Sequence, residues 1–181
     1  IVPEYDPFKY NSFPKMASDQ ILRLTKIVNK QMETLQARDG FDRFPPVLTF
    51  TSLVDSTVLT PELVRRFYSK LKPNGSELVL YDINRSEAMS TFIKERNEEF
   101  LKGLKADSTH FSLTLITNQN VGSQKVVAQR RLAGVPEWKE ESLQAEWPLG
   151  VYSLSHLAIP NSPEDPLYGN RPDLREKGGM V

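Results

Sequence analysis

The sequence predicts an α/β domain, in which helices cover a sheet that is at least partly parallel. Two observations carry this prediction. Helix-like and strand-like patterns alternate over residues 17–105, which is typical of strand–helix–strand units. The two strand-like runs, at 47–51 and 77–82, are mostly apolar, as expected of strands buried on both faces. A chain of 181 residues is long enough for one domain with a hydrophobic core.

Composition excludes several classes of function. Lys and Arg together number 23, as do Asp and Glu, so the chain lacks the basic field that favours nucleic acid or anionic membranes. No apolar run approaches the length of a membrane span. There are no cysteines, which excludes disulfides, thiol catalysis and cysteine metal sites. The two histidines lie far apart and lack metal-ligand spacing, so we expect no metal site.

The first helix is expected over residues 17–36. Ser18 or Asp19 can cap its N-terminus, and Gly40 is typical of the position just beyond a helix end. Residues 1–16 are rich in proline and aromatic residues without a period, so we expect an irregular segment there. Apolar residues recur at the three- and four-residue spacing of one helical face: Ile21, Leu24, Val28, Met32 and Leu35.

Strands and helices then alternate. Residues 47–51 are expected to form a buried strand, followed by a helix that Thr60 caps and Pro61 begins. Residues 77–82 are expected to form the second strand. Ser86 can cap a third helix, whose apolar residues are Met89, Phe92, Ile93, Phe100, Leu101 and Leu104.

The pattern changes after residue 105. The runs 110–117 and 125–132 are strand-like and flank a short polar loop, so they predict a hairpin within an insertion at 106–150. The polar stretch between the hairpin and residue 150 has no pattern of its own. Residues 151–181 are expected to form a final strand and a loop that carries a histidine.

Two candidate catalytic residues follow predicted strands. Asp55 comes after the strand at 47–51, and His156 comes at the end of the last one. Ligands of open parallel sheets bind beyond the carboxyl ends of the strands, and an aspartate beside a histidine can orient the imidazole as a general base. The alternatives are a turn-forming role for Asp55 and a structural, half-buried role for His156. His110 is a competing base.

A nucleophile is not visible in the sequence. A serine hydrolase with this kind of sheet needs a Gly-x-Ser-x-Gly turn between a strand and a helix. Ser76 and Ser123 each follow a glycine, but neither has the second glycine. Phosphate-binding loops, dinucleotide fingerprints and kinase motifs are also absent.

The segment PPVLTFTSLVDSTV resembles the part of α/β-hydrolases in which a core strand ends and the acid of the triad follows. The closest likeness is to lysophospholipases, monoacylglycerol lipases and serine aminopeptidases. PEYDPFKYNSFPKMASDQ is similar to the cap-proximal stretch of a bacterial subset, and YSLSHLAIPNSPEDPLYG to the histidine loop of that subset. The resemblance implies that Asp55 is the acid and His156 the base. It covers only the C-terminal half of such a domain.

This resemblance implies a serine hydrolase of carboxylic esters, with a small ester or lipid-like substrate and no cofactor. The serine would lie before Ile1, so the chain alone is expected to be inactive. A peptidase, an amide or thioester hydrolase of the same fold, and a non-catalytic interaction domain are the alternatives. The cellular compartment is left open, with the cytoplasm favoured.

A half-sheet would expose apolar faces and an unpaired strand edge. From the resemblance we therefore expect one partial domain over residues 1–181 that associates with itself or with a complementary N-terminal fragment.

Overall fold

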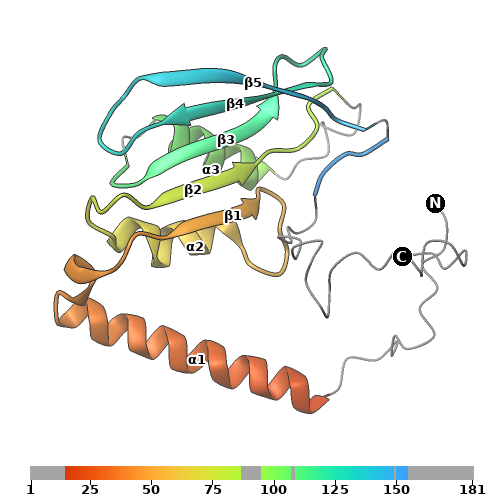
Figure 1. Cartoon of the computed structure of the whole chain (residues 1–181). Helices are drawn as coiled ribbons and strands as arrows, with labels where there is room; N and C mark the ends of the chain where they lie inside the picture. Colours follow the sequence, from red (N-terminus) through yellow and green to blue (C-terminus); the bar gives the residue numbers. More distant parts are fainter. Residues whose placement is uncertain (1–14, 87–94, 107–108, 149, 155–181) are drawn as a thin grey trace, which may run out of the picture.

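The computed structural model describes residues 15–86, 95–106, 109–148 and 150–154, which form a five-stranded mixed sheet with helices (Figure 1). The strand order is β1-β2-β3-β4-β5. The first three strands are parallel and the last two are antiparallel to their neighbours. The predicted α/β class is confirmed. The strands are β1 Leu48–Ser52, β2 Glu77–Tyr81, β3 Ser112–Asn118, β4 Lys125–Arg131 and β5 Trp138–Glu146.

In the described part of the chain three helices accompany the sheet: α1 Lys15–Ala37, α2 Thr60–Arg66 and α3 Glu95–Ala106. Short 3₁₀ turns follow α1 at Gly40–Arg43 (η1) and α2 at Tyr68–Lys70 (η2). In Figure 1, α3 lies behind β3, α2 lies beside β1, and the long helix α1 lies beyond β1. None of the described helices is long and apolar enough to cross a membrane.

The core lies between one face of the sheet and the helices. Leu78 and Leu80 of β2 are paired with Leu113 and Leu115 of β3, so all four side chains point to the same face. They are at most 1% exposed. The rest of the cluster comes from the helices and turns: Phe41, Leu53, Tyr68, Leu71, Leu101, Leu104 and Phe111. This packing holds the three parallel strands together, so that their carboxyl ends lie along the same side of the sheet.

The predicted hairpin is confirmed as β3 and β4, which pair in antiparallel register. β3 also pairs in parallel with β2, so the hairpin continues the same sheet. That residues 106–150 are an insertion stays a prediction. The sequence prediction missed β5. Most of its side chains are exposed, so it lacks the apolar alternation by which strands are recognised.

Several local predictions also change. Residues 151–154, predicted to begin a strand, are irregular. Ser18 and Asp19 lie inside α1 rather than at its cap, because the helix begins at Lys15. Thr60 does not cap α2. Its hydroxyl donates instead to the carbonyl oxygen of Ser52, at 2.8 Å, and so joins the start of α2 to the end of β1.

Other predictions lie outside the described residues. They are residues 1–14 of the segment predicted to be irregular over 1–16, the apolar positions Met89, Phe92 and Ile93 of the third helix, and the histidine loop with His156. The last two residues of that predicted segment belong to α1 instead.

Candidate functional site

The candidate site lies where the parallel strands β1, β2 and β3 end. Asp55 follows β1, Asp82 and Asn84 follow β2, and Asn118 is the last residue of β3. Because the three strands are parallel and in register, these residues come together along the carboxyl ends of the strands, here called the carboxyl edge of the sheet.

Asp55 holds the loop between β1 and α2. Its Oδ1 accepts hydrogen bonds from the backbone N–H groups of Thr57, at 2.7 Å, and Val58, at 2.9 Å. Its own N–H donates to the carbonyl of Ser52, at 3.1 Å. The turn-forming role that the sequence left open is therefore present. Within the described part of the chain, both bonds to the carboxylate use the same oxygen, which leaves Oδ2 for a second donor.

The segment 151–154 crosses the ends of β1 and β2. The Ser52 hydroxyl donates a hydrogen bond to the carbonyl of Leu154. The backbone N–H of Asn84 donates to the carbonyl of Tyr152, at 2.7 Å, and its side-chain amide donates to the carbonyl of Val151, at 2.9 Å. These bonds bring a segment from late in the chain to the edge where Asp55 lies. His156 comes two residues after Leu154, outside the described residues.

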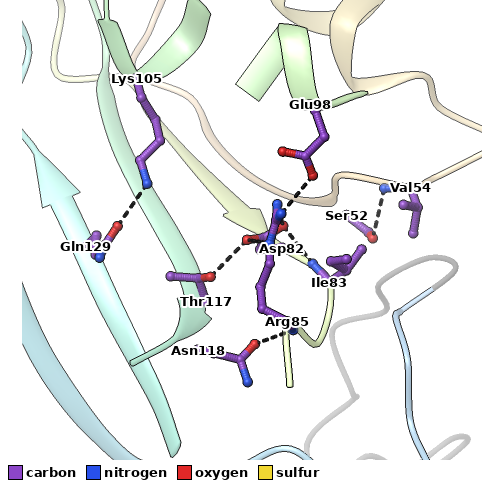
Figure 2. Close-up of polar contacts among 10 residues, drawn as sticks. All are labelled: Ser52, Val54, Asp82, Ile83, Arg85, Glu98, Lys105, Thr117, Asn118 and Gln129. Carbon is purple, nitrogen blue, oxygen red and sulfur yellow. Dashed lines mark hydrogen bonds and ion pairs between the residues drawn. The ribbon is translucent and has the colours of Figure 1, made fainter. Parts of the chain in front are cut away.

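A partly buried ion pair lies beside this segment, and the sequence analysis did not single it out. Figure 2 shows Arg85 against Asp82, with Glu98 reaching across from α3. Arg85 donates to both oxygens of Asp82, at 2.8 and 2.9 Å, and to Glu98 at 2.7 Å. Asp82 is 2% exposed and also accepts bonds from the Ile83 N–H and the Thr117 hydroxyl. Both oxygens of the buried Asp82 carboxylate are therefore hydrogen-bonded, as a buried charge requires.

The charges of this pair influence their neighbours. Burial alone would lower the pKa of Arg85, but the hydrogen bonds and charges of Asp82 and Glu98 outweigh it and raise that pKa. Burial raises the pKa of the Tyr152 phenol, and the positive charge of Arg85 opposes that rise. Arg85 therefore stays charged, and Tyr152 lies within its field.

A second set of bonds ties β2 to β3 at the same edge. The Asn118 side chain accepts a bond from the Arg85 N–H, at 2.7 Å, and donates to Asn84 Oδ1, at 3.0 Å. It also donates to the carbonyl of Ser123 in the hairpin loop. Both asparagines are at most 5% exposed. The sequence signal that was available is the Asp-x-Asn pattern directly after a buried strand.

A cavity of about 290 Å³ opens beside the ion pair, lined in part by Lys102, Lys105 and Gln129. Asp82 and Arg85 line it too, but they are occupied with each other. Lys105 donates to Gln129, at 3.2 Å (Figure 2). The described residues contain no cluster of three or more His, Asp or Glu side chains arranged to hold a metal ion. The geometry assigns the ion pair a structural role, which is to hold the chain that follows β2.

His110 and Asp55 lie at opposite ends of the parallel strands. His110 precedes β3, whereas Asp55 follows β1. Both strands run parallel to β2, which lies between them, so the start of β3 and the end of β1 are at opposite ends of the strands. Its exposed imidazole lines a different cavity, of about 480 Å³, together with Phe100 and Phe111. The fold therefore separates His110 from Asp55.

Comparisons with known protein families, with characterised proteins and with solved structures give no match to this chain. The likeness to α/β-hydrolases therefore rests on the residues quoted above. The arrangement of Asp55 and the 151–154 segment is the structural observation that bears on it.

Proposed function

We propose that this chain supplies the acid and the base of a Ser-His-Asp triad in a hydrolase of carboxylic esters. Asp55 would be the acid and His156 the base. The observation that supports this is the hydrogen bond from Ser52 to the carbonyl of Leu154. It anchors the chain two residues before His156 at the end of the strand that Asp55 follows. In the proposed triad, His156 would lie against Asp55.

The chemistry assigns each residue a distinct role. The imidazole of His156 would take the proton of a serine nucleophile and return it to the leaving alcohol. Oδ2 of Asp55 would accept the other ring N–H, hold the tautomer and stabilise the imidazolium. The serine and the oxyanion donors would come from a Gly-x-Ser-x-Gly turn, which the 181 residues lack. The substrate would be a small or lipid-like ester.

The Asp55 turn supports a second candidate, a non-catalytic interaction domain with a hydrolase-like sheet. In that case both bonds from Thr57 and Val58 are the whole role of the carboxylate. The two candidates differ in one measurable respect. Only the triad requires Asp55 to lie against His156.

The test uses the imidazole titrations of the intact chain, which contains two histidines. The C–H resonance of His156 is assigned with His156→Gln, and that of His110 serves as the internal reference. In Asp55→Asn the amide oxygen can still accept the two backbone bonds of the turn, but the negative charge is gone. We expect the titration midpoint of His156 to fall by about one pH unit, because a nearby carboxylate stabilises the imidazolium.

A His156 midpoint that is unchanged in Asp55→Asn would refute the pairing and favour the non-catalytic domain. Labelling with a fluorophosphonate probe is the second readout. We expect no labelling of the isolated chain. Labelling that an ester substrate competes away would show that the nucleophile lies within these residues.

A further inference from the structure

The cavity beside His110 opens where β3 begins, at the amino ends of the parallel strands. Its volume is about 480 Å³, within the range of roughly 300–1,000 Å³ that is typical of small-molecule sites. Its walls come from α2 (Val64), the η2 turn (Ser69), α3 (Gly103) and the turn before β3 (Phe111). We call it the amino-end cavity. It has the size of a ligand site and lies at the other end of the strands from Asp55.

The inner lining of the amino-end cavity is apolar. Leu104 and Phe111 are only 7% and 3% exposed, and Val64 and Phe100 pack partly buried against the same core. The ring of Phe111 also contacts the ring of buried Tyr68, with 4.7 Å between the centroids. An aromatic group bound here would gain both apolar burial and ring contacts.

Two hydroxyl groups at the mouth of the cavity already use their hydrogens. The Ser69 hydroxyl donates to the carbonyl of Arg65, at 2.7 Å, and the Thr109 hydroxyl donates to the carbonyl of Phe111, at 2.6 Å. A hydroxyl has one hydrogen to donate, so both oxygens can only accept a further bond. The Arg65 guanidinium is itself bonded to Glu62.

Glu99 and His110 are the other polar side chains of the cavity, and both are exposed at its mouth. Within the described part of the chain, neither side chain has a hydrogen-bond or ion-pair partner. The carboxylate can only accept hydrogen bonds, and a neutral imidazole has one acceptor nitrogen. None of the described residues that line the cavity is Lys or Arg. The mouth therefore offers a negative charge and several acceptors, which is the environment that a cationic donor requires.

Gly103 enlarges the cavity. It lies inside α3, four residues after Glu99 and three after Phe100, and so on the same face of the helix. A Cβ atom at this position would meet no heavy atom within 4 Å, so packing does not require a glycine. Glycine inside a helix is less stable than alanine. The chain thus loses helix stability at a position where a side chain would take up space in the cavity, and a bound ligand accounts for this choice.

We propose that the amino-end cavity binds an arylalkylammonium ion, in which a short chain joins an aromatic ring to an ammonium group. The ring packs against Phe100 and Phe111, and the ammonium group donates to Glu99 and to the other acceptors at the mouth. A free amine has this chemistry, and so has the N-terminal residue of a peptide that begins with phenylalanine. The inference does not depend on the proposed triad.

Other ligand classes fit the cavity less well. A carboxylate would approach the negative charge of Glu99 and find no Lys or Arg among the described lining residues. A neutral aromatic molecule would fill the apolar lining equally well, but it would gain no charge-assisted bond at the mouth. The ammonium group is therefore what distinguishes the proposed ligand.

The test titrates the intact chain with phenethylamine, phenethyl alcohol and phenylpropionate, which share a ring and a short chain but end in an ammonium, a hydroxyl and a carboxylate. The titration is carried out at about pH 8, where an imidazole is ordinarily neutral. For so small a ligand, the usual efficiency per atom predicts a dissociation constant of about 1 mM. We expect phenethylamine to reach this affinity and the other two to bind at least about tenfold more weakly. Backbone amide resonances of Gly103 and Phe111 should shift.

Three variants of the chain locate the site. Glu99→Gln keeps the shape of the side chain but removes its charge, and should weaken phenethylamine binding about fivefold to tenfold without affecting phenethyl alcohol. Glu141→Gln removes the same charge from an exposed position on β5 and should leave binding unchanged. Gly103→Leu should fill the cavity and abolish binding. It should also raise the melting temperature, because a Cβ fits there and leucine favours a helix.

Two peptides identify the source of the ammonium group. If Phe-Gly-Gly amide binds at least as tightly as phenethylamine, the ligand is a peptide N-terminus. If it binds more weakly, the ligand is a free amine. Both results support the ammonium site. The N-acetylated form of the same peptide, which lacks the charge, should not bind.

The proposal is overturned by any of the following results. If phenethyl alcohol, phenylpropionate or the acetylated peptide binds as tightly as phenethylamine, the cavity does not select an ammonium group. If Glu99→Gln and Glu141→Gln bind phenethylamine equally, Glu99 is not its partner. If phenethylamine does not bind at about 10 mM, or binds Gly103→Leu as tightly as the original chain, the cavity is not the site.

Discussion

The Ser52 hydroxyl donates a hydrogen bond to the carbonyl oxygen of Leu154, a residue 102 positions later in the chain. Ser52 is the last residue of β1 and is fully buried. One side chain thus joins the open edge strand of the sheet to the segment that leads to His156. The proposed triad depends on this bond, whereas the proposed ammonium site lies at the amino ends of the strands.

Replacing Ser52 by alanine should reduce the free energy of unfolding by about 1–2 kcal/mol, because the Leu154 carbonyl loses its donor in a partly buried position. It should also free residues 151–154, which faster backbone hydrogen exchange at Tyr152 would reveal. Ser69→Ala is the matched control, since the Ser69 hydroxyl bonds to the Arg65 carbonyl in an exposed turn. Equal effects of the two variants would contradict the anchoring role of Ser52.

Asp55→Ala and Asp55→Asn should differ in stability. Alanine removes the acceptor of the Thr57 and Val58 N–H groups and should lower the free energy of unfolding by about 1 kcal/mol. Asparagine keeps an acceptor oxygen and should be nearly neutral. Urea unfolding of both variants measures this. If asparagine destabilises as much as alanine, the negative charge rather than the turn is what the fold requires.

Asp82→Ala should destabilise the domain by about 3 kcal/mol. The change leaves Arg85 with Glu98 alone and deprives Thr117 and the Ile83 N–H of their acceptor. Asp42→Ala provides the comparison, because its ion pair with Lys72 is exposed and such pairs contribute little. Thermal unfolding of the two variants should therefore differ clearly. Similar melting temperatures would mean that the hydrogen bonds of Asp82 do not stabilise the chain that follows β2.

Tyr68→Phe should lower stability by about 1–2 kcal/mol, because the buried hydroxyl donates to the Glu77 carbonyl and is also hydrogen-bonded to the Thr49 hydroxyl. Burial raises the pKa of Tyr68, although the bond to Thr49 opposes the rise. Above pH 10 the unfolded phenol ionises while the folded one stays neutral, so its contribution is lost as the pH rises.

Urea unfolding between pH 8 and pH 11 measures this contribution. The difference between the original chain and Tyr68→Phe should narrow at the alkaline end. If the difference in unfolding free energy between the two proteins did not change with pH, the ionisation of Tyr68 would not contribute to the loss of stability.

The sequence predicted the elements whose burial produces a local run or period of apolar residues. The runs around Val79 and Leu115 are apolar because both strands are buried, and the hairpin joining β3 to β4 has a polar loop between apolar runs. By the same reasoning β5 could not be recognised, because an edge strand with most side chains exposed has no apolar period. The apolar stripe of α1 was visible in the sequence, but its exposure was not.

The candidate site shows the same division. Asp55 was identified because it follows a predicted strand, and its place at the carboxyl end of β1 is as expected. The Asp82–Arg85–Glu98 network was not predicted, because charged residues near a strand end are usually solvated. That these three side chains meet depends on how α3 packs against the sheet.

By itself, the sequence determined that the chain forms an α/β fold with two parallel strands, and which acidic residue follows the first of them. Hydrophobic periodicity carries that information along a few neighbouring residues. The prediction that both strands are buried on both faces is wrong for β1, where Leu48 and Phe50 are exposed because β1 is an edge strand of the described sheet. Only the tertiary structure decided that β3 continues the sheet in parallel and that Leu154 reaches Ser52. It also decided that His110 and Asp55 lie at opposite ends of the parallel strands. These relationships depend on contacts between distant parts of the chain, and no local pattern encodes such contacts.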